Sequence, residues 1–357
     1  MSKRIETEKK YYCLNNDELI EKLKLLNFKL IKYGKESDEY FTDINSEYIK
    51  NRTCLRIRKS DNKMEVTFKG KSKDFSNTFS KLESNLEVNK ENYEDFVNLF
   101  SMIGYYSYCI VNKTRSTYQM LDNEYTYNVM IDNIENLGGF VEFELIYNND
   151  NYDEDDLYSK LNKFVNLFSS LELEEANLPY RDFVAKKIYN DYLPKKDIYG
   201  VHINLDKFLK KYEKNFYSFY KLIMKQEFNC NSKIMAFREN IYDDIINPNI
   251  KRKFNKYFDN IKIQDGDLIL LFELLKQIKK KKLKILLSTN CNEIFINNML
   301  NKFLSINIID NIIYLNNNKS YYSEIKKHDI DLKNYFNVSK LPLKETNSIL
   351  LIIINNL

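Results

Sequence analysis

The sequence predicts an α+β protein whose first half is an antiparallel barrel or sandwich, and the charge pattern of its strands favours a closed eight-stranded antiparallel β-barrel with flanking helices. Eight short segments between residues 5 and 146 are rich in Tyr, Val, Ile, Phe and Thr, with Asn, Asp, Ser or Gly between them. Six of these segments place charged side chains on a single face. A boundary near residues 190–196 separates this barrel domain, residues 1–188, from a smaller α/β domain, residues 197–357.

The predicted elements follow from periodicity. In the first half we expect strands at residues 5–12, 38–44, 53–59, 63–70, 79–88, 108–119, 124–132 and 139–146, and helices at 16–27, 90–103 and 154–171. In the second half we expect helices at 204–228, 232–246, 268–280 and 292–304, and strands at 283–288, 311–315 and 348–354. This alternation of strand and helix is typical of a parallel sheet.

The composition and net charge of the chain argue against several classes of function. The chain has 357 residues, 43% hydrophobic and 30% charged, which is typical of globular domains. The net charge of +4 is too balanced to argue for nucleic acid. No apolar run reaches about 18 residues, so we expect no membrane span. The N-terminus lacks an apolar signal core, which favours the cytoplasm.

The metal-binding residue types point away from zinc. The five cysteines are scattered without a Cys-x-x-Cys pair, and the chain has only two histidines, His202 and His328. A zinc site and a disulfide framework are therefore not expected. Any metal would be held by carboxylates, which favour hard ions such as Mg²⁺ or Mn²⁺.

The charged pairs share one face of each predicted strand, because residues i and i+2 point the same way. The sets at this spacing, in which Thr67 is polar and every other residue is charged, are Glu6, Glu8 and Lys10; Arg56 and Arg58; Thr67 and Lys69; Lys81 and Glu83; Lys113 and Arg115; and Glu142 and Glu144. One interpretation is a solvated face of a one-sided sheet. If the sheet closes, the same face lines a lumen whose cations and carboxylates suit a polyphosphate with bound metal.

These motifs, in this order, resemble the CYTH superfamily of triphosphate tunnel metalloenzymes. The resemblance rests on Glu6-Thr7-Glu8-Lys9-Lys10, Asp38-Glu39-Tyr40-Phe41, Leu55-Arg56-Ile57-Arg58, Thr67-Phe68-Lys69-Gly70, Lys81-Leu82-Glu83, Val111-Asn112-Lys113-Thr114-Arg115 with Tyr118, Asp132 followed by Leu137-Gly138 and Phe140 to Glu144, and Leu178-Pro179-Tyr180. The departures are Lys81 for an Arg, Asn85 for a second Glu of some members, and Pro179 for a Ser.

The resemblance implies a role for each matching residue. Glu6, Glu8, Glu142 and Glu144 would ligate the divalent metal, with Asp132 assisting. The triphosphate would be held by Lys10, Arg56, Arg58, Lys69, Lys81, Lys113 and Arg115. Lys10, Arg56, Arg58, Lys69 and Arg115 would also be catalytic, together with Glu83, which would orient the cations or bind metal through water.

The reaction remains open between alternatives. Triphosphate hydrolysis requires only a positioned water, and inorganic, nucleoside or thiamine triphosphate would serve as substrate. The class IV adenylate cyclase reaction, which yields cyclic AMP and pyrophosphate, would use the same cradle. A non-catalytic polyphosphate- or nucleotide-binding module is the third reading. The expected partner is a small triphosphate, with neither nucleic acid nor membrane, and a dimer is an open possibility.

The second half weakly resembles a degenerate haloacid-dehalogenase (HAD) domain. Asp197-Ile198-Tyr199-Gly200-Val201 resembles its first motif, and Leu286 to Asn290 its second; Lys319 or Lys326 would be the later lysine. Tyr199 replaces the acidic group expected to act as acid and base, so the resemblance implies no phosphatase activity here. An unrelated α/β domain is the alternative.

Overall fold

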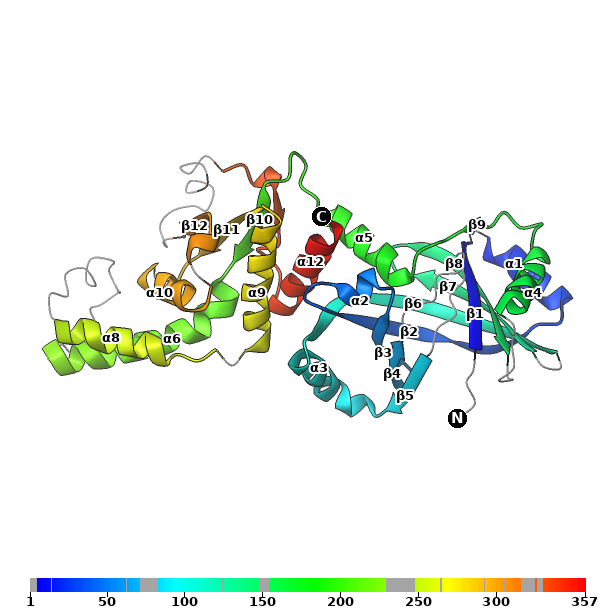
Figure 1. Cartoon of the computed structure of the whole chain (residues 1–357), viewed down its shortest axis with the longest axis horizontal. Helices are drawn as coiled ribbons and strands as arrows, with labels where there is room; N and C mark the ends of the chain where they lie inside the picture. The colour runs from blue at the N-terminus through cyan, green and yellow to red at the C-terminus, as the bar shows by residue number, and fades with distance from the viewer. Residues whose placement is uncertain are drawn as a thin grey trace. The chain divides into compact units, whose positions relative to one another are not determined.

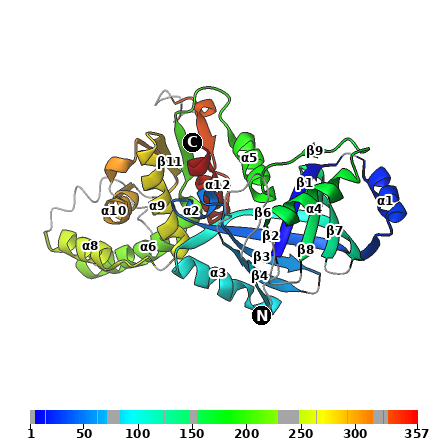
Figure 2. The same ribbon diagram turned by 45° about the vertical axis from the view of Figure 1, so that its right-hand side comes forward.

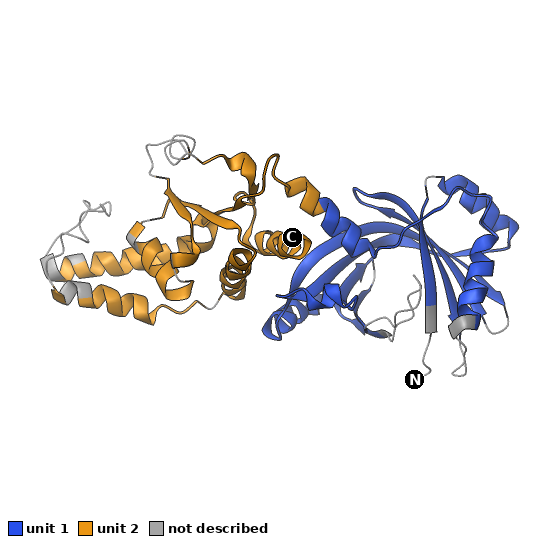
Figure 3. Ribbon diagram, turned by 45° about the horizontal axis from the view of Figure 1, so that its top comes forward, with its two compact units in different colours: residues 1–187 blue, residues 188–357 orange. Residues whose placement is uncertain are grey.

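The computed structural model describes residues 5–357 except residues 14, 62, 71–82, 123–124, 148–153, 229–247, 264, 292, 305, 316–324 and 326–329. The chain forms two compact units, residues 1–187 and residues 188–357 (Figure 3). In the described residues no helix has both the length and the apolar character needed to cross a membrane.

Unit 1 is built on one nine-stranded sheet in the order β5-β4-β3-β2-β6-β7-β8-β1-β9, with antiparallel neighbours throughout. The strands are β1 (Ile5–Tyr12), β2 (Lys29–Asp43), β3 (Cys54–Ser60), β4 (Met64–Lys69), β5 (Glu83–Val88), β6 (Tyr105–Asp122), β7 (Tyr125–Ile134), β8 (Gly138–Tyr147) and β9 (Glu174–Glu175). All eight predicted strands are present, and β2 and β6 are the two longest, running together through most of the unit (Figure 2).

The predicted closure of the sheet into a barrel is wrong for the described residues. The sheet ends at β5 on one side and, on the other, at the two-residue strand β9, which pairs with β1 only at Tyr11 and Tyr12. Alternation fixes which side chains share a face, but it does not determine whether the first and last strands meet. The charged face is therefore the inner face of a curved open sheet.

Helices cover the apolar face of this sheet, as the alternation requires. Helices α1 (Asn16–Leu25) and α4 (Glu154–Asn166) pack over one part, where Leu19 and Leu161 meet Val141 and Phe143 of β8. Helix α3 (Tyr93–Met102), which follows the 3₁₀ turn η1 (Lys90–Asn92), covers another part, where Phe100 contacts Phe41. The remaining helices are α2 (Glu47–Lys50) and α5 (Tyr180–Tyr192).

Unit 2 has a parallel four-stranded sheet in the order β12-β11-β10-β13. Its elements are β10 (Gly200–Asn204), α6 (Asp206–Phe228), α8 (Pro248–Asn260), α9 (Gly266–Lys280), β11 (Lys284–Thr289), α10 (Glu293–Phe303), η2 (Ile306–Ile308), β12 (Asn311–Tyr314), η3 (Leu332–Asn334), β13 (Tyr335–Asn337) and α12 (Leu343–Asn356) (Figure 1). The predicted helix at 232–246 lies outside the described residues.

Two expectations for unit 2 are not met. The predicted terminal strand at 348–354 is part of helix α12, because a short apolar run fits a buried helix as well as a buried strand. Asp197 lies before β10, at the amino end of the parallel sheet, whereas ligand sites in such sheets lie at the carboxyl ends of the strands. Lys319 and Lys326 lie outside the described residues. The HAD resemblance therefore gains no support.

Candidate active site

A cavity of about 300 Å³ lies on the inner face of the unit 1 sheet. It is lined by basic and acidic side chains from several strands: Lys10, Arg56, Arg58, Lys69, Lys113 and Arg115, with Glu8, Glu65, Glu142 and Glu144. Tyr40, Tyr180 and Arg181 also contribute to its wall. The i, i+2 rule thus brings cations and carboxylates from distant parts of the sequence into one space.

Strand register places opposite charges across from each other. Lys10 of β1 lies opposite Glu142 of β8, and the Lys10 Nζ is 3.2 Å from the Glu142 Oε1. Glu36 of β2 lies opposite Lys113 of β6. Because directly opposed side chains are the closest cross-strand neighbours, this register neutralises part of the buried charge.

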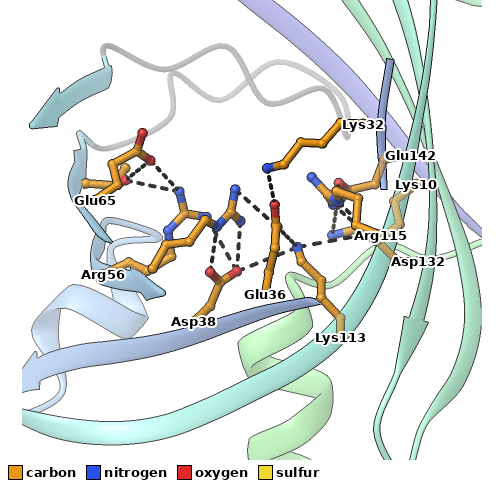
Figure 4. Close-up of polar contacts among 12 residues, drawn as sticks. Lys10, Lys32, Glu36, Asp38, Arg56, Glu65, Lys113, Arg115, Asp132 and Glu142 are labelled. Atoms are coloured by element: carbon orange, nitrogen blue, oxygen red, sulfur yellow. Dashed lines mark hydrogen bonds and ion pairs between the residues drawn. The ribbon is translucent and has the colours of Figure 1, made fainter. Parts of the chain in front are cut away.

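Two arginines are clamped by fully buried aspartates (Figure 4). The Arg58 Nε and Nη2 donate to the two Asp38 oxygens at 2.6 and 2.8 Å. The Arg115 Nε donates to Asp132 Oδ1 at 2.6 Å, and Nη2 donates to the other oxygen. Such bidentate pairs fix the plane of the guanidinium. Each arginine is therefore held in a set orientation in the wall of the cavity.

Lys113 and Glu36 are also buried, and they lie next to the arginine–aspartate pairs. The Lys113 Nζ lies 3.6 Å from Glu36 Oε2 and 3.6 Å from Asp38 Oδ2. Burial lowers the pKa of Lys113, and the positive charge of Arg115 lowers it further. Glu36 also accepts a 2.7 Å hydrogen bond from the Lys32 Nζ. Burial opposes ionisation of Glu36, but Arg58, Lys113 and Arg115 lower its pKa to about 2.

The ionised Glu36 carboxylate should stabilise unit 1, so Glu36→Gln is expected to lower the free energy of unfolding at pH 7 by about 1–3 kcal/mol. Because the folded pKa is depressed, this stabilisation is present above the ordinary value of 4.5 and is lost as the pH falls toward about 2. Urea unfolding at several pH values from 7 to 3 should therefore show a narrowing gap between wild type and variant.

The matched control is Glu47→Gln, which breaks an exposed ion pair with Lys50 at 3.2 Å. Exposed pairs of this kind contribute only about 0–1 kcal/mol. A gap for Glu36→Gln that is as wide at pH 3 as at pH 7 would show that the charge of Glu36 does not stabilise the fold.

Glu8 and Glu144 break the pattern of opposite charges, since they lie directly across from each other on β1 and β8. The Asn128 Nδ2 donates to Glu144 Oε2 at 2.7 Å. Burial raises the pKa of Glu144; the Asn128 hydrogen bond opposes this, while the charges of Glu8 and Glu142 raise it further. Two like charges held together are stabilised by a cation, so this pair fits a divalent metal ion.

The Glu8 and Glu144 pair would supply only part of the ligand shell of a metal ion. In the described part of the chain no three His, Cys, Asp or Glu side chains lie close enough to hold an ion. Mg²⁺ commonly binds through one or two carboxylates, with substrate phosphates and water completing its shell. The Glu8 and Glu144 pair meets that requirement, because both line the cavity that holds the cations.

Glu142, two residues before Glu144 on β8, contacts basic side chains of the cavity. Its carboxylate contacts Lys10 and accepts a hydrogen bond from the Arg115 Nη2. Burial favours its neutral form, but Arg115 and Lys10 hold its pKa below the ordinary value. Glu142 thus stays ionised and holds two of the basic side chains that line the cavity, while direct metal ligation by it remains a prediction.

Of the remaining predicted site residues, one is buried outside the cavity lining and the side chains of three are not described. Asp132 is fully buried behind Arg115, and both of its oxygens already accept hydrogen bonds. The strands carrying Glu6 and Glu83 are described, but these two side chains are not, and Lys81 lies outside the described residues. Their proposed roles stay predictions.

Several residues of the site are assigned no role by the sequence analysis. Glu36, Asp38 and Tyr40 follow the same i, i+2 pattern along β2, and that pattern could have identified them as inward-facing. Tyr180 begins α5, and the Lys10 Nζ lies 3.8 Å from the centroid of its ring. Contact of a helix residue with the sheet depends on tertiary packing, for which strand periodicity gives no signal.

A curved antiparallel sheet whose cavity is lined by basic side chains and by a carboxylate pair suits the class of proteins that take a polyanionic phosphate with a divalent ion. The CYTH domain profile matches residues 4–179. A Methanocaldococcus jannaschii protein named "Putative adenylate cyclase" is 34% identical over 140 residues, covering 39% of this chain and 76% of that protein. The chain belongs to the CYTH family, and its first half is a triphosphate-processing enzyme domain.

Several solved structures are similar to this half of the chain. The PH1819 protein of Pyrococcus horikoshii is 24% identical, with 51% of this chain and 99% of that chain covered and a TM-score of 0.43. A Hippeastrum protein, described as a "putative adenylyl cyclase" with a dominant triphosphatase activity, is 14% identical, with 49% and 92% covered and a TM-score of 0.38. Scores this low add nothing to the family assignment.

Proposed function

We propose that unit 1 hydrolyses a triphosphate substrate with the help of Mg²⁺ or Mn²⁺. The observation that carries this proposal is that one cavity is lined both by seven basic side chains and by the Glu8 and Glu144 pair. A polyphosphate chain neutralises the cations, and a divalent ion shared with its oxygens neutralises the carboxylates.

The residues of the cavity suit positioning and charge stabilisation. Arg58 and Arg115 are held by their aspartates, so their remaining donors need little reorganisation when phosphate oxygens arrive. Lys10 and Lys113 add point charges close to the Tyr180 ring. The metal, when bound, would neutralise negative charge on the phosphoryl oxygens. Residues 1–187 contain no histidine, so no Ser–His or Cys–His nucleophile is available to this unit.

A water molecule is the simplest nucleophile for such a site, because phosphoryl transfer needs positioning and electrostatics more than covalent catalysis. The second candidate is adenylate cyclisation, in which the ribose hydroxyl of ATP attacks the α-phosphorus. The name of the Methanocaldococcus jannaschii relative favours it. Both reactions use the same phosphate cradle, so the products must distinguish them.

The deciding experiment offers the purified full chain tripolyphosphate, ATP or thiamine triphosphate with Mg²⁺ or Mn²⁺. We expect metal-dependent release of orthophosphate. Cyclic AMP and pyrophosphate from ATP, without orthophosphate, would establish the cyclase instead. Tight binding of all three compounds without any product would identify a non-catalytic binding module.

A further inference from the structure

The net charge of +4 is unevenly distributed between the two units. Residues 1–187 contain 27 Lys and Arg against 33 Asp and Glu, a net charge of −6. Residues 188–357 contain 28 against 18, a net charge of +10. A large charge difference between the halves of a chain is typical of proteins in which one half contacts a polyanion.

The positive charge of unit 2 is ordered along helix α6. Lys207, Lys211, Lys214, Lys221 and Lys225 recur at intervals of three, four or seven residues and are all exposed. With 3.6 residues per turn they fall on one face, where they form a stripe about 27 Å long. We call these five residues the lysine stripe.

The opposite face of α6 is buried in unit 2. Leu209, Phe216, Tyr220 and Ile223 lie on that face and are at most 3% exposed. Phe216 packs against Phe254 and Phe258 of α8, with ring centroids 5.9 and 5.3 Å apart. The apolar face of the helix therefore packs against the rest of unit 2, and the face that carries the lysine stripe is exposed.

The stripe differs from an ordinary solvated helix face, which usually mixes both signs of charge. The described acidic side chains of α6, Asp206 and Glu213, lie roughly 100° and 120° around the helix from the centre line of the stripe. Within the described residues, no carboxylate lies within 4.0 Å of the five stripe ammonium groups. Asp206 instead accepts hydrogen bonds from Thr289 and Asn290.

We propose that the lysine stripe of α6 binds the phosphodiester backbone of a nucleic acid. A regular row of single-sign charge matches the repeated phosphates of RNA or DNA, and binding would be largely independent of sequence. An anionic membrane fits less well, because a membrane-binding helix also needs a free apolar face. This proposal departs from the expectation drawn from whole-chain charge, and it does not depend on the reaction in unit 1.

The test measures binding of the full chain to a fluorescent 30-nucleotide single-stranded RNA and to a DNA duplex of the same length, by anisotropy across a salt series. The stripe variant is Lys211→Gln, Lys214→Gln and Lys221→Gln combined. Glutamine keeps helix propensity close to that of lysine. We expect this variant to bind about 10-fold or more weakly at ~0.1 M salt, with the slope of log K against log salt reduced by about 2–3.

The matched control removes the same charge from another exposed cluster of unit 2: Lys280→Gln, Lys281→Gln and Lys282→Gln combined. It should bind nearly as well as wild type. Circular dichroism and the triphosphatase rate should be unchanged in both variants, which separates this test from that of unit 1. Equal losses in the two variants, no binding by wild type, or binding only to phosphatidylserine vesicles would each overturn the proposal.

Discussion

Glu144→Gln is expected to abolish metal-dependent turnover while leaving unit 1 folded. The substitution keeps the shape of the side chain but removes one of the two carboxylates that lie opposite each other on β1 and β8. Loss of a metal ligand removes several kcal/mol of transition-state stabilisation, so we expect a decrease in kcat/KM of roughly 10²-fold or more. Mn²⁺ binding, followed by electron paramagnetic resonance, should weaken in parallel.

The pH dependence of Mn²⁺ binding gives a second readout for the same residue. Burial raises the pKa of Glu144, so protonation competes with metal at a higher pH than for an ordinary glutamate. Metal affinity should fall as the pH decreases through this raised pKa, and Glu144→Gln should flatten that dependence.

Glu135→Gln is a matched control. Glu135 accepts a 2.9 Å hydrogen bond from the Asn112 amide, just as Glu144 accepts one from Asn128, but it is exposed and does not line the cavity. Full activity is expected for this control. Wild-type turnover in Glu144→Gln, or in the presence of a chelator, would contradict a metal at the Glu8 and Glu144 pair.

The sequence was most informative where local periodicity and tertiary structure agree. Strand β8 has one apolar face, and burial of Val141 and Phe143 under α4 forces Glu142 and Glu144 to the other side. A one-residue shift in register would expose the whole apolar face, so side-chain direction is strongly determined. This is why the pairs at i and i+2 identified most of the cavity lining.

Features that depend on partners distant in sequence were harder to predict. The open edge of the sheet depends on whether β5 and β1 meet, and neither strand contains that information. The run from Ile349 to Ile354 has β-branched residues typical of a strand, yet it forms helix α12, which packs against α9. There, burial of the apolar run in tertiary contacts overrides its local propensity.

The roles of the buried aspartates show the same limit. Asp132 was expected to assist metal binding, since carboxylates are the ligands that Mg²⁺ prefers. In the structure it lies opposite Arg115 on the neighbouring strand and forms a bidentate pair with it. Only the strand register reveals this pairing, because 17 residues separate the two in sequence.

Arg56→Lys is expected to lower kcat/KM for tripolyphosphate by about 10–100-fold, although it conserves the charge. Arg56 lies in the cavity wall, where its Nη2 donates to the Thr67 hydroxyl at 3.0 Å. The planar guanidinium can hold that bond and still direct other donors toward phosphate oxygens, whereas lysine is a point charge on a flexible stem. Each lost charge-assisted hydrogen bond costs roughly 1.5–3 kcal/mol, which corresponds to this range.

Whether the loss of activity appears in kcat or only in KM tests at which stage of the reaction Arg56 acts. If its donors contact the phosphoryl group that gains charge in the transition state, kcat should fall together with kcat/KM. Arg52→Lys is the control, because Arg52 is exposed and does not line the cavity. A simple phosphomonoester reaches fewer of the cations, so wild type should process it far less efficiently than tripolyphosphate. Equal efficiency on both substrates, or an Arg56→Lys enzyme with wild-type kinetics, would show that the basic strands do not form a triphosphate cradle.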